Sequence, residues 1–393
     1  MKKRLLIIVN RLLQGGIDTI LIEYLKKIDR QKYTISLAIG TCMEEQETYI
    51  HSVPSDISVH YLVKKHFLIN YRKQRSIKKV SPFIKTYDEM VLSPMRRIIQ
   101  QRNLNKLIKK NDIVIDFDST FYSFLKNCPI PKISFFHFSF RQYHNGNKRK
   151  LVRLGRKMEV YDKIVTICDA MKEEGIEMYP ALKDKFVTIY NAFDTATIAK
   201  KAEEPVNSPL INRPYILAVQ RLEESQKDLS TLIRAYKILV DKYAIKEDLY
   251  VIGEGKSRTD LQNLCQRLNI IDRVVFLKKQ INPYPWMKHC RTFVLSSKFE
   301  GFGIVLIEAM ALNCPIVSSD CPTGPEEILA FGKAGALVPI GDEQAMATAI
   351  ERTLSDTEYR EELTSNMKEQ IKKFDIQVSI LEIQNLVSSL LSI

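Results

Sequence analysis

Two glutamates, Glu300 and Glu308, are the residues of this chain whose setting most suggests chemistry, because they flank a Gly-Phe-Gly turn and an apolar run. A carboxylate inside an apolar run is costly to desolvate unless a partner such as a ligand pairs with it. Gly301 and Gly303 let the backbone approach a ligand, and a helix that starts near Gly303 presents unpaired N–H groups to an anion such as a diphosphate. Carboxylates beside such a site are suited to accept hydrogen bonds from ribose or sugar hydroxyls. A pattern this short is by itself more typical of a turn, so other motifs in the chain must decide between a turn and a ligand site.

A pair of cations lies upstream, in the segment ILAVQRLEESQKDL. Arg221 ends a predicted strand, and Lys227 comes just before a predicted helix. Two cations placed in this way can neutralise a departing diphosphate. Alone the pair is more typical of a solvated turn, but together with the glutamate motif it indicates a site for a phosphorylated substrate.

Two other short motifs indicate rival chemistries. Asp116 and Asp118 form a D-x-D of the kind that metal-dependent transferases use to bridge a divalent cation to a diphosphate, although polar residues that close a strand fit it better. Gly253 and Gly255 begin a glycine-rich turn, but Arg258 stands where a dinucleotide fingerprint needs its third glycine. We therefore expect neither a catalytic metal nor a nicotinamide cofactor.

The elements that must position these residues follow a repeating strand–helix pattern. Apolar strands alternate with amphipathic helices in the first half of the chain, and a second such series begins near residue 215. Residues 201–214 between them are polar and contain prolines, as in a linker. The pattern predicts an α/β protein of two Rossmann-like domains, residues 1–200 and 201–375, facing each other across a cleft that holds the site.

Composition narrows the class of protein. With 45% hydrophobic and 27% charged residues, the 393-residue chain has a globular composition and is long enough for two domains. Its longest apolar runs fall short of the roughly 20 residues that a bilayer span needs, and the N-terminus has no signal-peptide h-region, so we expect a cytoplasmic location. The seven cysteines lack C-x-x-C spacing, which favours reduced thiols over a zinc site or a disulfide framework.

The net charge of +13 belongs to the first half of the chain. Residues 1–200 hold 36 Lys and Arg against 20 Asp and Glu, whereas the remainder holds 23 against 26. The cations cluster in Lys64–Lys79, where aromatic and aliphatic residues interleave them, and in Asn147–Lys157. Such segments suit an anionic membrane surface, although a nucleic-acid patch or a solvated basic face would have a similar composition.

The second half resembles the retaining glycosyltransferases of the GT-B family numbered four. The resemblance rests on SSKFEGFGIVLIEAMALNCPIVSSD, which contains the E-x7-E motif of that family, and on AVQRL followed by QKDL, VIGEG, VTIYNAFD and the N-terminal NRLLQGG. It is dense from Val187 to Val338 and thin between Gly40 and Asn111. It implies the GT-B fold and a last segment, 376–393, whose helix returns to the N-terminal domain.

The resemblance also implies roles for individual residues. Glu308 would accept the ribose hydroxyls of a nucleotide, Glu300 would contact the donor sugar, and Arg221 and Lys227 would hold the diphosphate as it leaves. His137 would lie beside the donor sugar, although a packed histidine between aromatic residues is an equal interpretation. Further donor contacts would come from the backbone at Phe302, Gly303 and Ile304, from Gly15 and Gly16, from the turn at Gly253, and from Leu277 and Lys278 beside the nucleobase.

This sequence departs from the family pattern in three places. The usual Asn-Gly turn is Asn191-Ala192 here, and the spacing from Arg221 to Lys227 is one residue longer than the commonest form. GGIDT replaces an acidic GGAE segment, so Asp18 would stand in for that acid.

Taken together, these features predict an enzyme that transfers a hexose or N-acetylhexosamine from a nucleotide sugar, with UDP as the expected carrier. No two carboxylates can be placed on both faces of the anomeric carbon, as a double displacement would require. The resemblance implies the mechanism accepted for the family instead, a same-face substitution that retains the configuration. The acceptor would be a lipid-linked or membrane-presented saccharide, and the enzyme would lie at the inner face of the plasma membrane. Three alternatives stay open: a catalytically silent partner of another transferase, a metal-dependent transferase that uses Asp116 and Asp118, and a nucleic-acid-binding protein, which the acidic second half disfavours.

Overall fold

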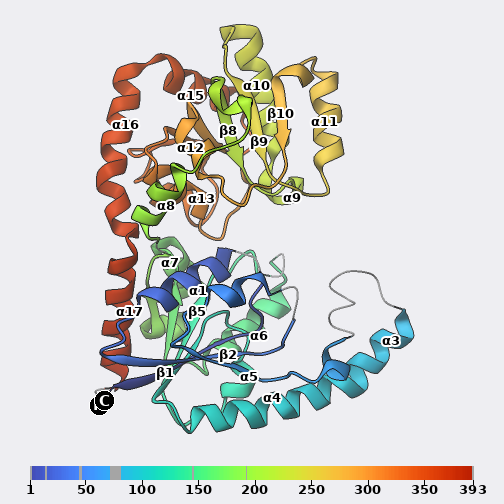
Figure 1. Cartoon of the computed structure of the whole chain (residues 1–393), viewed down its shortest axis with the longest axis vertical. Helices are drawn as coiled ribbons and strands as arrows, with labels where there is room; N and C mark the ends of the chain where they lie inside the picture. Colours follow the sequence, from blue (N-terminus) through green and yellow to red (C-terminus); the bar gives the residue numbers. More distant parts are fainter. Residues whose placement is uncertain are drawn as a thin grey trace. The chain divides into compact units, whose positions relative to one another are not determined.

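The computed structural model describes residues 2–13, 16–43, 47–70, 81–143, 146–191 and 193–391. The chain forms two compact units (Figure 1). Unit 1 comprises Met1–Tyr190 and Ile376–Ile393, and unit 2 comprises Asn191–Asp375.

Unit 1 is built on a parallel sheet of seven strands in the order β3-β2-β1-β4-β5-β6-β7. The central strands are apolar and buried along most of their length, as expected when helices cover both faces of a parallel sheet. The strand order reverses between β1 and β4, and ligands in such sheets bind at the carboxyl ends of the strands flanking this switch point. The strands are β1 (Lys3–Val9), β2 (Tyr33–Ile39), β3 (Ser58–Tyr61), β4 (Ile113–Asp116), β5 (Lys132–Phe136), β6 (Lys163–Thr166) and β7 (Phe186–Thr188).

The helices of unit 1 connect these strands, and a last helix comes from the end of the chain. They are α1 (Gly16–Lys27), η2 (Thr48–Ser52), α3 (Pro82–Tyr87), η3 (Asp88–Leu92), α4 (Ser93–Ile108), α5 (Tyr122–Leu125), α6 (Lys148–Met158), α7 (Asp169–Met178), η4 (Pro180–Lys185) and α17 (Ile376–Leu391).

Unit 2 has a parallel sheet of six strands in the order β10-β9-β8-β11-β12-β13, with its switch point between β8 and β11. Its strands are β8 (Tyr215–Val219), β9 (Asp248–Ile252), β10 (Val274–Leu277), β11 (Thr292–Leu295), β12 (Ile316–Ser319) and β13 (Ala336–Val338). Its helices are α8 (Thr195–Ala202), η5 (Pro209–Asn212), α9 (Glu224–Lys227), α10 (Leu229–Tyr243), α11 (Arg258–Arg267), η6 (Ile271–Arg273), α12 (Tyr284–His289), α13 (Ile304–Ala311), α14 (Pro325–Ile328), α15 (Glu343–Ser355), α16 (Thr357–Gln370) and η7 (Ile371–Phe374).

The boundary between the units lies about ten residues before the predicted one at residue 200. The difference arises because α8 packs on α12 and α13, and Phe193 forms a β-bridge with Asp375 at the other end of unit 2. The polar segment 201–214 is therefore part of unit 2, where the carbonyl oxygen of Leu210 accepts a 3.1 Å hydrogen bond from the Tyr250 hydroxyl.

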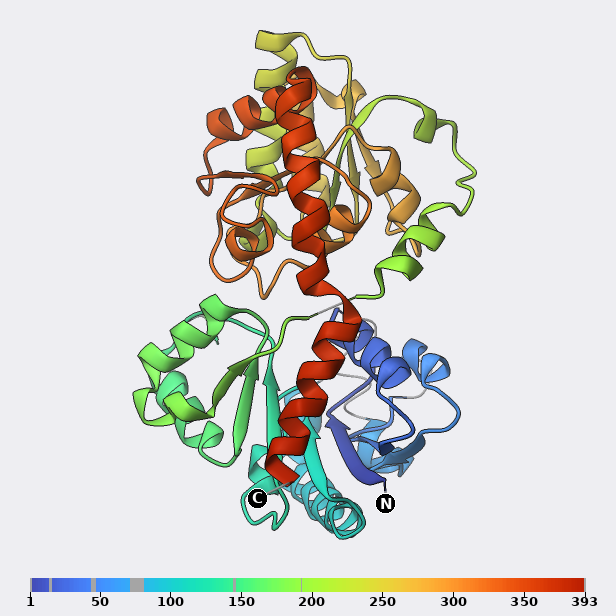
Figure 2. The same cartoon turned by 90° about the vertical axis from the view of Figure 1, so that its left-hand side faces the viewer.

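The C-terminal helix α17 packs on α1 within unit 1, where Figure 2 shows it running along the unit. The Ser379 hydroxyl donates to the carbonyl oxygen of Tyr190 at 2.7 Å, and the Tyr24 hydroxyl donates to the same oxygen at 3.1 Å. Among the described residues, no helix is both long and apolar enough to cross a bilayer.

Candidate functional site

The loop after β11 in unit 2 carries the glutamate motif and leads into α13. Gly303 is the residue before this helix, and its φ of 90° lies in the left-handed region that favours glycine. Phe302 is buried, with its ring edge-to-face against Phe374 at 5.9 Å, so its side chain anchors the loop. The N–H groups at the start of α13, around Ile304, remain the groups suited to bind an anion.

A buried ion pair joins this loop to the loop after β8. The ammonium of Lys227 lies 2.5 Å from Oε1 of Glu300, and the two side chains are only 11% and 8% exposed. The Ser297 hydroxyl donates to the same carboxylate oxygen at 2.5 Å. The structure thus brings two predicted site residues from distant parts of the chain into direct contact, next to the N-terminus of α13.

Arg221 lies in the same β8 loop but is exposed, and its guanidinium donates to Oε1 of Gln226 at 2.8 Å. Gly253 determines how closely the neighbouring β9 loop approaches. A Cβ atom at Gly253 would lie 2.0 Å from the carbonyl oxygen of Gln220, and one at Gly255 would lie 2.2 Å from that of Leu222. Only glycine allows the two loops to meet in this way.

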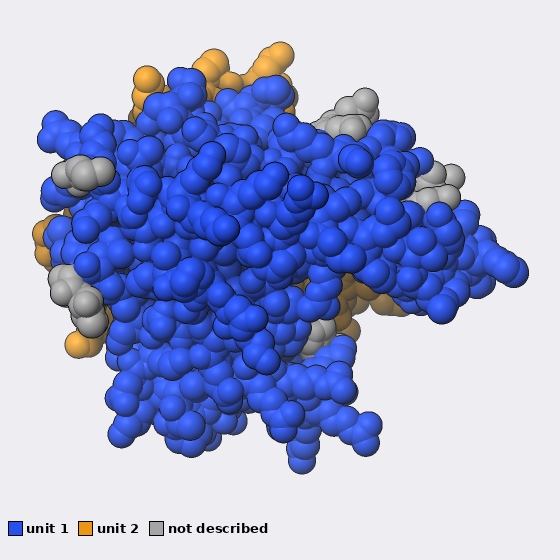
Figure 3. Space-filling view, turned by 90° about the horizontal axis from the view of Figure 1, so that it is seen from below, with its two compact units in different colours: residues 1–190, 376–393 blue, residues 191–375 orange. Residues whose placement is uncertain are grey.

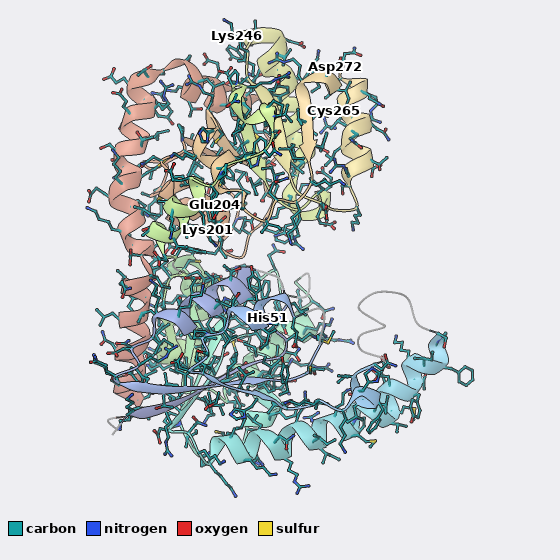
Figure 4. The ribbon with its side chains drawn as sticks, viewed as in Figure 1. His51, Lys201, Glu204, Lys246, Cys265 and Asp272 are labelled. Carbon is teal, nitrogen blue, oxygen red and sulfur yellow. The ribbon has the colours of Figure 1, made fainter. Side chains whose placement is uncertain are left out.

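Glu308 has different neighbours from those of Glu300. The Tyr284 hydroxyl donates to its Oε1 at 3.0 Å. Burial raises the pKa of Glu308 to about 7, while the Tyr284 hydrogen bond and the positive charge of Lys201, labelled in Figure 4, act in the opposite direction. Its hydrogen-bond partner thus differs from those of Glu300, and in its ionised form the carboxylate is suited to accept hydrogen bonds from a ligand.

The predicted nucleobase contacts lie at the end of β10. Leu277 is half-buried, whereas Lys278 is exposed. Arg258 holds this strand end, because its guanidinium donates to the carbonyl oxygen of Phe276 at 2.7 Å and lies 5.8 Å from the centre of the Phe276 ring. The residue that interrupts the glycine fingerprint thus has a structural role that the sequence did not indicate.

His137 follows β5 in unit 1 and is buried between aromatic rings, with the Phe117 ring 5.1 Å away. Its Nε2 lies 2.7 Å from the carbonyl oxygen of Phe117, and burial lowers the pKa of the imidazole to about 4. Nδ1 makes no hydrogen bond to any described residue. The ring is therefore a neutral, packed imidazole. Gly16 begins α1, whereas Gly15 and Ala192 lie outside the described residues.

The D-x-D motif is engaged in hydrogen bonds within unit 1. Asp116 accepts from the backbone N–H of Phe121 at 2.8 Å and from the Tyr161 hydroxyl at 2.5 Å. Asp118 accepts from the backbone N–H of Asn10 at 2.8 Å, which ties the end of β4 to the end of β1. These contacts support the interpretation of both residues as the polar closure of a strand.

Asp18 lies near Asp118. Burial and the negative charge of Asp118 together raise the pKa of Asp18 to about 7. The acid that replaces the family's glutamate is thus a group that titrates near neutral pH.

A polar pocket of about 190 Å³ in unit 1 is a feature that the sequence did not reveal. It lies at the switch point of the sheet, since Asn10 follows β1 and Thr120 follows β4, and α4 forms its other wall. Its lining is Asn10, Ser93, Arg96, Arg97, Gln100, Thr120, Phe121, Ser123 and Phe124. The α4 residues belong to no motif, so no sequence signal marked them.

Comparison with protein families and curated proteins shows which proteins this chain is similar to. Residues 200–370 match the family model described as glycosyl transferases group 1. The chain is 33% identical over 203 residues to the N-acetylgalactosamine-N,N'-diacetylbacillosaminyl-diphospho-undecaprenol 4-alpha-N-acetylgalactosaminyltransferase of Campylobacter jejuni, covering 52% of this chain and 53% of that protein. It is 29% identical over 314 residues to an uncharacterized glycosyltransferase of Methanocaldococcus jannaschii, covering 71% and 73%. The chain thus spans about half the length of the first relative.

Solved structures resemble the whole chain. The lipopolysaccharide outer core galactosyltransferase WaaB in its apo form has a TM-score of 0.73 at 19% identity, covering 98% of this chain and 99% of that one. The Anabaena protein Alr3699/HepE in complex with UDP has a TM-score of 0.75 at 17% identity, covering 99% and 100%. The fold is therefore GT-B, and unit 2 contains a glycosyl transferases group 1 domain.

Proposed function

We propose that this protein is a retaining glycosyltransferase that moves a hexose or N-acetylhexosamine from a UDP-sugar to a lipid-linked saccharide in the synthesis of a cell-surface glycan. The name of the Campylobacter jejuni relative describes a diphospho-undecaprenol acceptor, and a Staphylococcus aureus relative, 29% identical over 198 residues, is a capsular polysaccharide biosynthesis glycosyltransferase. Similar solved structures hold UDP or UDP-glucose. These relatives support both the donor and the acceptor.

The buried Lys227–Glu300 ion pair is the observation that carries the proposal. An ion pair so shielded from water is stable only with good geometry, and here the Ser297 hydroxyl supports the carboxylate as well. The pair holds an ammonium and a carboxylate at the N-terminus of α13, where the helix favours an anion. Lys227 would stabilise the diphosphate, and Glu300 would contact the donor sugar.

The transfer itself would be a same-face substitution. The bond from the anomeric carbon to the diphosphate oxygen breaks, the acceptor oxygen bonds to the same face, and the acceptor proton passes to the departing diphosphate. The protein would contribute position and charge: Arg221 and Lys227 on the diphosphate, the α13 N–H groups beside it, and Glu308 on the ribose. Leu277 and Lys278 would lie by the nucleobase, and Gly253 keeps the β9 loop close.

Unit 1 would bind the acceptor. Its polar pocket at the β1–β4 switch point has the hydroxyl, amide and guanidinium groups that suit the polar end of a lipid-linked saccharide. As the resemblance implies, His137 would lie beside the donor sugar, and Gly15 and Gly16 would be near the phosphates. The basic segment Lys64–Lys79, of which residues 71–79 lie outside the described part of the chain, would favour a peripheral position at the inner face of the plasma membrane.

We also propose that no catalytic metal takes part, because the carboxylates of Asp116 and Asp118 already accept hydrogen bonds from unit 1. Nucleotide release from UDP-, GDP- and ADP-sugars, with and without EDTA, tests the donor and the metal together. Turnover of one UDP-sugar that is insensitive to EDTA supports the proposal. Loss of activity with EDTA would shift attention to Asp116 and Asp118.

Two variants test the site residues in the same assay. Lys227→Ala removes charge from the leaving group and is expected to lower kcat by on the order of 100-fold. Glu308→Ala removes the carboxylate that would accept hydrogen bonds from the ribose hydroxyls. It is expected to raise the donor KM by roughly 10-fold or more. Lys368→Ala and Glu361→Ala, at exposed positions of α16 in unit 2, are matched controls that should behave as wild type. A donor that binds without turnover would favour a catalytically silent partner instead.

A further inference from the structure

One helical stretch of unit 1, from Pro82 to Ile108, has a strongly anchored face. It consists of α3, η3 and α4 in direct succession. Buried residues recur every four positions along it, at Asp88, Leu92, Arg96, Gln100, Leu104 and Ile108. The Arg96 guanidinium lies 2.6 Å from the Asp88 carboxylate and donates to the carbonyl oxygen of Leu68 at 2.7 Å. The stretch is therefore fixed to unit 1 along this row.

Apolar side chains cover the exposed side of the same stretch. Phe83 is 90% exposed, Met90 73% and Ile98 70%. Tyr87, Val91 and Met95 are exposed as well, so the row has the three- and four-residue spacing of one helix face. Of the fourteen large apolar side chains that are exposed among the described residues, six lie here. A concentration of this kind indicates an interaction surface rather than scattered apolar residues.

The surroundings of this apolar stripe are basic. Between residues 81 and 110, Glu89 is the one exposed acid among the described side chains, because Asp88 is buried against Arg96. The exposed cations are Lys85, Arg97, Arg102, Lys106, Lys109 and Lys110. Apolar residues on one face with flanking Lys and Arg are the pattern of helices that lie in the interface of an anionic bilayer. A symmetric contact with a second copy would bring these cations against one another.

We propose that the apolar stripe of α3, η3 and α4 docks unit 1 on an anionic lipid surface, with Phe83, Met90 and Ile98 entering the acyl boundary and the flanking cations contacting lipid phosphates. In Figure 3, unit 1 extends into a projection at the right of the view, on the side where Figure 1 places α3. Helix α4 of this stretch also supplies Ser93, Arg97 and Gln100 to the polar pocket. The inference rests on the proposed function, because docking would bring this pocket to the membrane that carries the acceptor.

Vesicle flotation of the full chain tests the docking surface. The probes are phosphatidylcholine vesicles with and without phosphatidylglycerol, and the variant is Phe83→Ser/Met90→Ser/Ile98→Ser. We expect wild type to float with the anionic vesicles and the variant to bind on the order of 100-fold more weakly, since three apolar side chains leave the lipid. The control Ile281→Ser/Phe331→Ser/Leu381→Ser removes exposed apolar residues elsewhere and should bind as wild type.

Donor hydrolysis without vesicles, measured on the same samples, separates this inference from the proposed function. The stripe variant should hydrolyse donor as wild type does, because its three residues lie outside the donor site. Flotation of wild type without any donor turnover would contradict the proposed function and support the docking surface. Equal flotation of wild type and the stripe variant would overturn the docking surface. A second outcome would also overturn it: wild type does not bind vesicles and sediments as a dimer, and the stripe substitutions dissociate that dimer. The apolar stripe would then be a contact between two copies of the chain.

Discussion

Glu308 is the residue whose protonation most directly controls the candidate donor site. Burial brings its pKa to about 7, and the ionised form is the stronger hydrogen-bond acceptor for ribose hydroxyls. Donor affinity should therefore weaken as the pH falls below neutral. Tyr284 acts through this carboxylate, since its hydroxyl stabilises the ionised form.

Tyr284→Phe should raise the pKa of Glu308 further, because the stabilising hydrogen bond is lost. We expect the midpoint of UDP binding, followed by calorimetry against pH, to move upward by about 0.5 to 1 pH unit, with affinity restored at high pH. Tyr250→Phe removes a hydroxyl that contacts the backbone of Leu210 instead, and should leave the midpoint in place. An unchanged midpoint in Tyr284→Phe would contradict the assigned role.

The different hydrogen-bond partners of the two glutamates bear on what the sequence could predict at the scale of residues. The type and spacing of Glu300 and Glu308 predicted a site in which the two glutamates have different roles. That Lys227 is the direct partner of Glu300 was not predictable, because 73 positions separate them and only the meeting of two strand ends joins them. Tyr284 and the pocket residues on α4 carry no motif, so no local pattern could mark them.

The close approach of the β8 and β9 loops in unit 2 depends on a glycine. A Cβ at Gly253 would lie 2.0 Å from the carbonyl oxygen of Gln220, and its φ of 155° is itself unfavourable for other residues. Gly253→Ala should therefore lower the free energy of unfolding by about 2–4 kcal/mol and displace the loop that carries Arg221.

Gly332→Ala is the matched control for this substitution. Gly332 has a φ of 88°, but no atom lies within 4 Å of its Cβ position. The expected cost there is only about 1 kcal/mol, from the backbone conformation alone. Urea unfolding of the two variants measures the difference, and equal costs would mean that the loop contact contributes nothing.

The elements that the sequence predicted best are those with apolar strands and family motifs. β1, β2, β4, β5, β6, β7 and every strand of unit 2 coincide with apolar runs of the sequence. β3 and the stretch from α3 to α4 were missed, because the strand is short and mixed and the helix exposes apolar residues on the side away from the core. The boundary at residue 200 was misplaced because α8 is polar in composition yet packs on unit 2.

At the scale of the whole molecule, stability should fall as the pH rises through neutrality. The pKa values of Asp18 and Glu308 are both about 7 in the folded chain, above those of an unfolded chain, so the folded state holds more protons than the unfolded state below pH 7. The stabilisation is complete at acidic pH and is lost as the pH rises through about 7. The buried His137, with its pKa lowered to about 4, acts in the opposite direction as the pH falls through its unfolded pKa of about 6.5, and it offsets part of the change at the acidic end of this range.

The free energy of unfolding should therefore drop by at most about 1 kcal/mol per carboxyl group between about pH 6 and 7.5. Urea unfolding of the ligand-free chain at both pH values measures it. Glu308→Gln cannot release the proton and should show a shallower fall, whereas Glu343→Gln, exposed on α15, should keep the wild-type slope. A slope that Glu308→Gln leaves unaltered would show that this carboxyl group does not titrate in the range.

The chain passes between the units twice, after Tyr190 and after Asp375, and the Phe193–Asp375 bridge holds the two ends of unit 2 side by side. Unit 2 is in this sense an insertion between two parts of unit 1, and the Ser379 hydrogen bond to Tyr190 closes unit 1 across the point of insertion. A unit whose two ends are adjacent can be exchanged for another without any change in the path of the remaining chain. Under the proposed function, with the donor on unit 2 and the acceptor on unit 1, recombination at this one point would change the donor preference without changing the acceptor preference.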